Sequence, residues 1–222
     1  MTGAEPTTGL VIGTLFLALV ASVFWPLTQH LITMTHEGSH AIVGSMTGGK
    51  IASMKMNMDG TGATNVRGSN VFLSALVGYA GPSLFGLLGA TLLANSVDPD
   101  VILWVSLALL AVIFLQIRNV FGWVAVLVVG VFFFMVVHYG TQTGRMVFVY
   151  TVTWFLLLGG FMHTVQYNMK NLGWSADAGI LRDATRLPRG LWGLLWWLAT
   201  LAALIYGGGL LLGAIDPLLH FA

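Results

Sequence analysis

The chain has 222 residues, of which 57% are hydrophobic and only 8% are charged, whereas an average soluble domain carries about 25% charged residues. This composition excludes a soluble globular fold and indicates a polytopic protein whose main surroundings are the lipid bilayer. The formal net charge is +1 and the basic residues are scattered, so nucleic acid is not an expected partner. The absence of cysteine excludes disulfides, thiolate catalysis and sulfur ligands for a metal.

The hydropathy pattern predicts an all-α membrane protein with about six transmembrane helices in one membrane-embedded domain, 1–222. The predicted spans are 9–45, 71–95, 101–117, 120–139, 146–167 and 190–215. The first is too long for one straight crossing, because a bilayer core needs about 20 residues. We expect Pro26 to kink it. No Lys or Arg precedes it, so we expect this run to be retained as a span.

The loop at 49–69 carries strand signals and is expected to form a short β-hairpin at the membrane surface. Methionines alternate with polar residues over 54–58, the pair Asp59-Gly60 predicts a turn, and "ATNV" at 63–66 can return as a second strand. Between the fifth and sixth spans lies a longer loop, 168–189, which is polar and contains several charged residues.

The basic residues predict the orientation of the chain. If 9–45 crosses the membrane once, all but Arg145 fall in loops on one side. These residues are Lys50, Lys55, Arg67, Arg118, Lys170, Arg182, Arg186 and Arg189. The positive-inside rule makes this side cytoplasmic and leaves both termini outside.

A metal-binding motif lies near the cytoplasmic end of the first span. His36, Glu37 and His40 spell H-E-x-x-H, and polar residues at three- and four-residue steps over 29–44 form a stripe that must avoid lipid. Two histidines four residues apart share a helix face and can bind one Zn²⁺, while the glutamate holds a water as general base. The alternative is a set of packed polar residues, which costs several kcal/mol in a membrane unless something pairs them.

A catalytic zinc usually has three protein ligands, so one ligand is missing from the motif. The candidates on the cytoplasmic side are Asp177, Asp183, Asp59 and His163. Each has an ordinary explanation. Asp177 follows a helix N-cap signal at Ser175 and would stabilise the helix dipole. Asp183 suits an exposed ion pair, Asp59 a turn, and His163 a structural hydrogen bond.

Four further polar residues have weaker claims to a role. His30 is a candidate for a position behind the metal ligands or for a hydrogen bond within the bundle, and His138 and His220 lie toward the outer side, which excludes them as ligands. Asn119 is a candidate to stabilise an oxyanion, with a helix-terminal cap as the alternative.

Five segments, in this order, resemble the bacterial site-2-protease-like membrane metallopeptidases. They are "HEGSHAIVGSMTGGKI", "DGTGATNV", "GYAGPSLFG", "RNVFG" and "SADAGILRDATRLPRGLW", and they cover about 31–197. The resemblance implies that His36 and His40 bind zinc, that Glu37 is the catalytic base and that Asp177 is the third ligand. One alanine more than in the family pattern separates Ser175 from Asp177, and the family's Asn-x-x-Pro…Leu-Asp-Gly run and PDZ domain have no counterpart.

The resemblance implies hydrolysis of membrane-spanning or membrane-associated protein substrates at a bacterial cytoplasmic membrane. We expect the hairpin, 54–66, to hold an extended substrate segment by adding a strand, and proline substitutions over 51–58 to impair this. The rival hypotheses are a metal transporter and a scaffold or assembly factor that retains the zinc site. A transporter needs ionisable groups along a path across several spans, and 71–95, 101–117 and 120–139 are nearly free of them.

Overall fold

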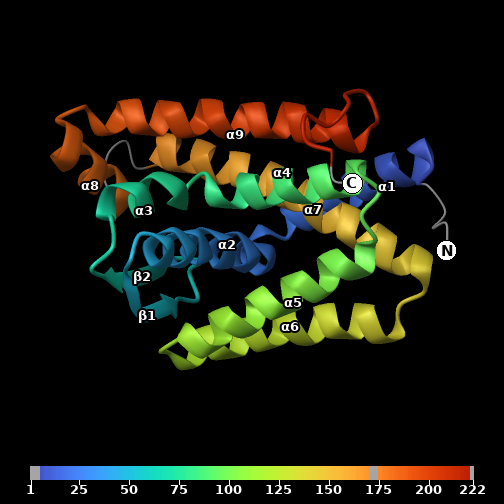
Figure 1. Cartoon of the computed structure of the whole chain (residues 1–222), viewed down its shortest axis with the longest axis horizontal. Helices are drawn as coiled ribbons and strands as arrows, with labels where there is room; N and C mark the ends of the chain where they lie inside the picture. The colour runs from blue at the N-terminus through green and yellow to red at the C-terminus, as the bar shows by residue number, and fades with distance from the viewer. Residues whose placement is uncertain (1–5, 171–174, 221–222) are drawn as a thin grey trace.

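The computed structural model describes the main chain of residues 6–170 and 175–220, and the side chains of these residues except those of 167–170. It is mostly helical and has one two-stranded sheet after the first helix pair, so the predicted fold class is confirmed (Figure 1). The elements are α1 (Thr8–Val23), α2 (Trp25–Met46), β1 (Lys50–Met56), β2 (Gly62–Arg67), α3 (Val71–Gly78), α4 (Gly81–Ala94), α5 (Pro99–Gln116), α6 (Val120–Tyr139), α7 (Gln142–Lys170), α8 (Ala176–Thr185) and α9 (Arg189–Leu211).

Four helices, α5, α6, α7 and α9, are each long and apolar enough to cross a membrane. Two bent pairs, α1 with α2 and α3 with α4, reach the same criterion when each pair is taken together, which allows up to six spans. The chain is therefore an integral membrane protein. The helix α6 covers the same residues as the predicted span 120–139.

Both bent pairs break more sharply than the sequence suggested. The axes of α1 and α2 differ by 104° across Phe24, and Pro26 lies in the first turn of α2 instead of inside one kinked helix. The axes of α3 and α4 differ by 70°, and Pro82 lies in the first turn of α4. Proline is tolerated there because the first amides of a helix have no partner within it, so each proline begins a new helix.

The polar elements gather at one end of the helical bundle. Figure 1 shows β1, β2, α8 and the turn between α5 and α6 at the left, and both chain termini at the right. The ion pair between Arg145 and Asp100 links the first turns of α7 and α5 at the terminal end. The predicted grouping of all other Lys and Arg residues on one side is consistent with this arrangement.

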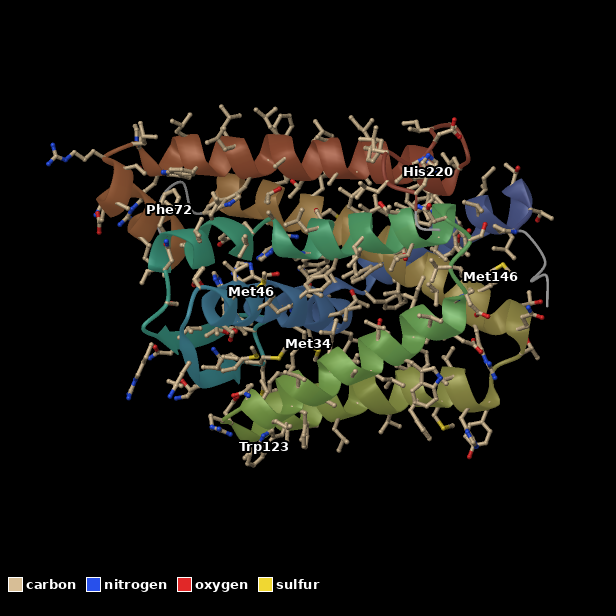
Figure 2. All side chains as sticks on the ribbon, viewed as in Figure 1. Met34, Met46, Phe72, Trp123, Met146 and His220 are labelled. Carbon is tan, nitrogen blue, oxygen red and sulfur yellow. The ribbon has the colours of Figure 1, made fainter. Side chains whose placement is uncertain are left out.

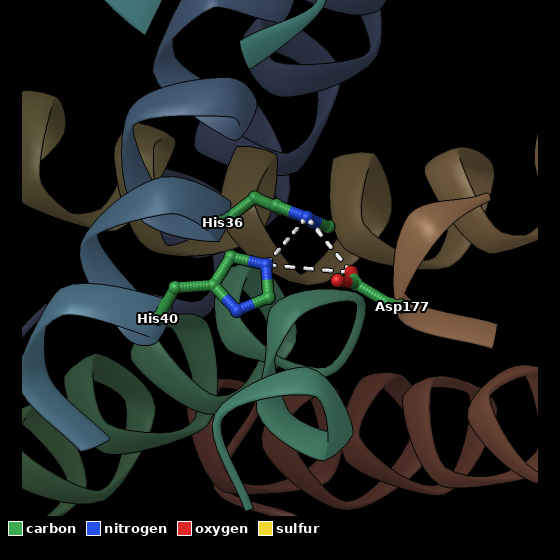
Figure 3. Close-up of side chains that lie close together, drawn as sticks. All are labelled: His36, His40 and Asp177. Carbon is green, nitrogen blue, oxygen red and sulfur yellow. Dashed lines mark hydrogen bonds and ion pairs between the residues drawn. The ribbon is translucent and has the colours of Figure 1, made fainter. Parts of the chain in front are cut away.

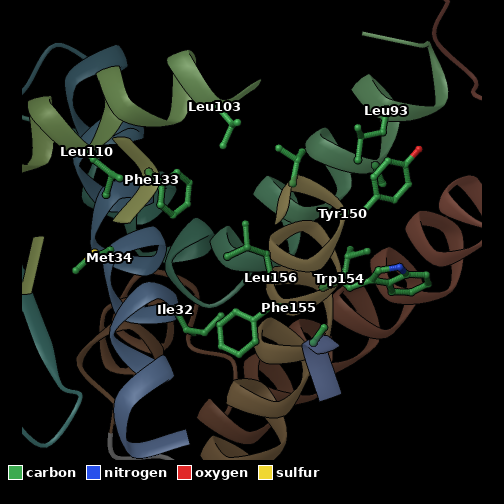
Figure 4. Close-up of a cluster of buried hydrophobic side chains, with 14 of the residues drawn as sticks. Ile32, Met34, Leu93, Leu103, Leu110, Phe133, Tyr150, Trp154, Phe155 and Leu156 are labelled. Carbon is green, nitrogen blue, oxygen red and sulfur yellow. The ribbon is translucent and has the colours of Figure 1, made fainter. Parts of the chain in front are cut away.

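The main hydrophobic core surrounds α7. Its residues Trp154, Phe155 and Leu156 are buried among side chains from α2, α4, α5 and α6 (Figure 4). Outward-facing side chains of α5, α6 and α9 are largely apolar and exposed, as expected of surfaces that face lipid (Figure 2). The core thus holds α2 in place, and α2 carries the H-E-x-x-H motif.

The hairpin is confirmed, and it runs back along α2 and packs against it. Its strands are antiparallel, with Met56 opposite Gly62 and Met54 opposite Thr64. The turn reaches the middle of α2, where the Thr33 hydroxyl donates a hydrogen bond of 2.6 Å to the Gly60 carbonyl. The hairpin therefore lies at the same depth as the motif.

Close packing of α4 on α7 generates a testable prediction. A Cβ on Gly86 would lie 2.8 Å from the main-chain nitrogen of Leu157, which cannot move aside. We expect Gly86→Ala to destabilise the protein by about 1–3 kcal/mol through overpacking, measured as a lower Tm in detergent. The matched control is Gly130→Ala on α6, where nothing lies within 4 Å; equal Tm values for the two variants would contradict this packing.

Candidate metal centre

The helix α2 buries the whole H-E-x-x-H motif. His36, Glu37 and His40 are 9%, 4% and 8% exposed. Since residues i and i+4 lie one turn apart on the same face, the two imidazoles come together, and their Nε2 atoms are 3.2 Å apart. The polar stripe predicted over 29–44 faces protein, as expected.

The short helix α8 brings an aspartate to the histidines. Its first turn is capped by the Ser175 hydroxyl, which accepts a hydrogen bond of 3.1 Å from the Ala178 amide. A second apolar cluster anchors it, because Ala178 and Leu181 are fully buried with Trp192 and other side chains from α3 and α9. This helix start is the one predicted from the sequence, and it holds Asp177 inside the bundle.

The three potential ligand atoms form a compact triangle. Asp177 Oδ2 lies 3.4 Å from His36 Nε2 and 3.3 Å from His40 Nε2 (Figure 3). Ligands about 2.0–2.2 Å from a tetrahedral Zn²⁺ lie about 3.3 Å from one another. All three side chains are buried and offer two imidazole nitrogens and one carboxylate oxygen. The spacing and the chemistry of these donors fit a zinc ion, with a fourth position left open.

Surrounding groups orient two of the three side chains. His40 Nδ1 lies 2.8 Å from the Ser74 carbonyl, so it carries the proton and leaves the Nε2 lone pair free for a metal. Burial alone would raise the pKa of the Asp177 carboxyl, but in the metal-free protein hydrogen bonds and charge from His36 and His40 protonated at Nε2 outweigh this and hold the pKa below its usual range. Asp177 is therefore ionised, as a metal ligand must be.

Glu37 lies beside the triangle but outside it. Its Oε2 atom is buried and has no hydrogen-bond partner within the described part of the chain, although such atoms are normally paired. A Cβ on Gly62 would lie 2.6 Å from Glu37 Oε1, so the absence of a side chain at this point of β2 makes room for the carboxylate. An unpaired carboxylate next to an open metal position can accept a proton from water.

Glycine allows α3 and α4 to approach the site. A Cβ on Gly78 would lie 2.5 Å from His40 Nε2 and 2.8 Å from Asp177 Oδ2, and a Cβ on Gly81 would collide with Ser39. The segment "GYAGPSLFG" is one of the five that carry the family resemblance. Its contact with the metal centre could not be found from the sequence, because it depends on how α3 folds over α2.

The other candidate ligands are not part of the cluster of ligand atoms that His36, His40 and Asp177 form. Asp59 is exposed and accepts hydrogen bonds from the amide and hydroxyl of Thr61, which lower the pKa of its carboxyl. Asp183 is exposed and pairs with Arg182. His163 is close, with its ring 5.5 Å from that of His36, but it is not among the three residues whose ligand atoms cluster.

The remaining polar residues are separate from the metal centre. His30 contacts Phe121 edge-on and its Nδ1 has no hydrogen bond among the described residues, so the expected bundle hydrogen bond is not formed by that atom. His220 lies at the opposite end of the bundle from Phe72 of α3 (Figure 2). Asn119 bonds to Met56 of β1, and its side chain caps no amide of α6, so the alternative role as a helix cap is wrong and the oxyanion role stays a prediction.

A cavity of about 890 Å³ connects the centre with the hairpin. His36, Glu37, His40 and Asp177 line one part of it, and residues 60–66, which include most of β2, line another. The cavity is therefore large enough for a segment of polypeptide, and it places that segment between a strand and the candidate metal site.

Comparison with known proteins yields one match. The family model described as Peptidase M50B-like matches residues 9–207, which is most of the chain. No curated protein and no solved structure matches the chain.

The ligand assignment leads to a second prediction. Asp177→Ala removes one of three donors, so we expect zinc bound per purified chain to fall from about one to well below one half after dialysis, because loss of a ligand weakens binding strongly. Asp183→Ala is the matched control, since Asp183 lies on the same helix but is exposed and paired with Arg182. Full zinc retention in Asp177→Ala, measured by atomic absorption, would show that the third ligand is a different residue.

Proposed function

Since the chain belongs to the Peptidase M50B-like family, we propose that it is an intramembrane zinc metalloprotease of the site-2-protease type. The observation that carries the proposal is the buried triangle of His36, His40 and Asp177 with the unpaired carboxylate of Glu37 beside it. A scaffold or a transporter would have no need of such a carboxylate next to an open ligand position. Among the described residues, the buried ionisable side chains His36, Glu37, His40 and Asp177 lie together at one end of the bundle and do not trace a path across it.

The proposed roles of the residues follow from their positions. His36, His40 and Asp177 would hold the zinc, which supplies a bound water of lowered pKa and polarises the scissile carbonyl. Glu37 accepts the proton of the attacking water on its free carboxylate oxygen. As the carbon–nitrogen bond breaks, Glu37 delivers that proton to the leaving amine, so the carboxylate is regenerated and one water is consumed per bond.

The substrate must present an extended segment, because the carbonyls of a helix are bonded to its own amides. In the hairpin, the main-chain amide of Asn57 donates a hydrogen bond to the Thr61 carbonyl, so these two residues form a hydrogen-bonded pair. Hydrogen-bonded and non-hydrogen-bonded pairs alternate along an antiparallel ladder. The main-chain N–H and C=O groups of Gly62 and Thr64 therefore point away from β1. No described element bonds to this side of β2, which lines the cavity beside Glu37. The edge that accepts a substrate strand is thus proposed to be β2.

This assignment corrects the expectation that proline substitutions over 51–58 would disturb substrate pairing directly. The outer edge of β1 is occupied, because Arg118 donates a hydrogen bond to the Met54 carbonyl and Asn119 bonds to Met56. The proposed substrate is a membrane-spanning or membrane-associated protein, and the site would lie near the cytoplasmic face of a bacterial cytoplasmic membrane, with both termini outside. The positive-inside grouping of the basic residues supports this orientation.

The catalytic assignment predicts the behaviour of Glu37→Gln. Glutamine has the same shape but cannot accept the proton, so we expect cleavage to fall by at least about a hundredfold while zinc content stays at the wild-type level. Labelled casein in detergent is a suitable probe, since its chain is already extended. A Glu37→Gln variant that binds zinc and cleaves casein at the wild-type rate would rule out the proposed mechanism.

The strand-addition assignment predicts the effect of Thr64→Pro. Proline is tolerated on an open strand edge but removes the outward amide, so we expect kcat/KM for casein to fall about three- to tenfold through the lost hydrogen bond. Thr64→Val controls for loss of the hydroxyl that bonds to the Glu37 carbonyl. Met58→Pro controls for the presence of a proline in the hairpin. Met58 is the second residue of a turn that is closed by a hydrogen bond from the Gly60 amide to the Asn57 carbonyl, and proline is favoured at this position. If Met58→Pro impairs cleavage as much as Thr64→Pro, the substrate does not pair with β2.

A further inference from the structure

The side chain of Asn119, in the turn between α5 and α6, is joined to the hairpin by two hydrogen bonds. Its Oδ1 accepts from the Met56 amide at 3.1 Å, and its Nδ2 donates to the Met56 carbonyl at 2.6 Å. A carboxamide offers one acceptor and a donor in a plane, which is the pair of groups that a neighbouring strand would present to Met56.

The main chain beside Asn119 extends this pairing. Arg118 donates its amide to the Met54 carbonyl at 2.9 Å, and Ile117 forms a parallel bridge with Met54. The side chains of Met54, Met56 and Ile117 are completely buried. Residues 117–119 therefore act as a short third strand on the outer edge of β1.

Local sequence makes the carboxamide available for this contact. Asn119 lies at the N-cap position of α6, yet its side chain caps no amide of that helix. A Cβ on Gly122 would lie 2.8 Å from Asn119 Oδ1, so the glycine one turn later leaves room for the side chain to turn toward β1. The position that sequence alone assigned to a cap or an oxyanion is used for strand pairing.

The stability of a two-stranded hairpin explains why this contact matters, since such a hairpin is at best marginally stable by itself. Pairing with residues 117–119 makes β1 the central strand and leaves β2 as the open edge beside Glu37. We propose that Asn119 is a positioning residue that holds β1, and through it β2, in the arrangement that receives an extended peptide. The inference rests on the proposed protease function and names a part of its substrate-binding apparatus.

The inference predicts a loss of affinity for extended ligands without a loss of the metal centre. If Asn119→Ala lets the hairpin fluctuate, peptide affinity falls in proportion to the ordered fraction. Two lost hydrogen bonds correspond to about a tenfold weakening. The probes are a peptide hydroxamate, which combines a zinc-binding group with a strand, and acetohydroxamic acid, which has the zinc-binding group alone. We expect Asn119→Ala to weaken the binding of the peptide hydroxamate and to leave the binding of acetohydroxamic acid unchanged.

Two further variants separate positioning from general damage. Asn119→Asp keeps the acceptor but replaces the donor by an oxygen that repels the Met56 carbonyl. It should therefore weaken the binding of the peptide hydroxamate at least as much as Asn119→Ala does. Val120→Ala should bind both probes as wild type does, because the Val120 side chain at the start of α6 is 73% exposed and lies outside the 117–119 strand.

Hydrogen exchange on the full-length protein in detergent tests the same inference without any ligand. In Asn119→Ala, amides of β1 and of its turn should exchange about tenfold faster, while those of α4 and α7 stay unchanged. Unchanged hairpin exchange, or equal weakening of both hydroxamates, would overturn the positioning role. If wild type binds neither hydroxamate, the proposed function fails, and the exchange measurement still decides whether Asn119 holds the hairpin.

Discussion

The need to pair two imidazoles and a carboxylate inside an apolar bundle governs the architecture of this protein. His36, His40 and Asp177 are each at most 9% exposed, and their ligand atoms lie within 3.4 Å of one another. Buried polar groups of this kind cost several kcal/mol unless each finds a partner. A zinc ion would satisfy all three donors at once and would leave one position open for chemistry.

Each surrounding element contributes one part of the centre. The helix α2 presents both histidines, the apolar cluster under α8 holds Asp177, and the break between α3 and α4 places Gly78 where a larger residue would collide with the ligands. The hairpin completes the site from the other side, since Gly62 leaves space for Glu37. The turn at 117–119 ties the α5–α6 pair to β1, so helices far from the candidate metal site support the hairpin that flanks it.

The sequence predicts those features that depend on neighbouring residues. The spacing of His36 and His40 placed both on one helix face, and the cap at Ser175 was visible as a local signal. Asp177 was less certain, because an aspartate in a first helical turn has an ordinary explanation that remains true in the structure. The bend angles, the contact of Gly78 with His40 and the pairing of Asn119 with Met56 could not be predicted, because they depend on how segments distant in sequence meet.

The central claim is that His36, His40 and Asp177 bind one zinc ion, and zinc X-ray absorption spectroscopy of the purified wild-type protein tests it most directly. The account predicts one zinc per chain, with two imidazole nitrogens at about 2.0–2.1 Å and one carboxylate oxygen at about 2.0–2.2 Å. A spectrum that requires three imidazole ligands would show that the third ligand is a histidine and not Asp177. A protein that binds no zinc when zinc is supplied would contradict the account.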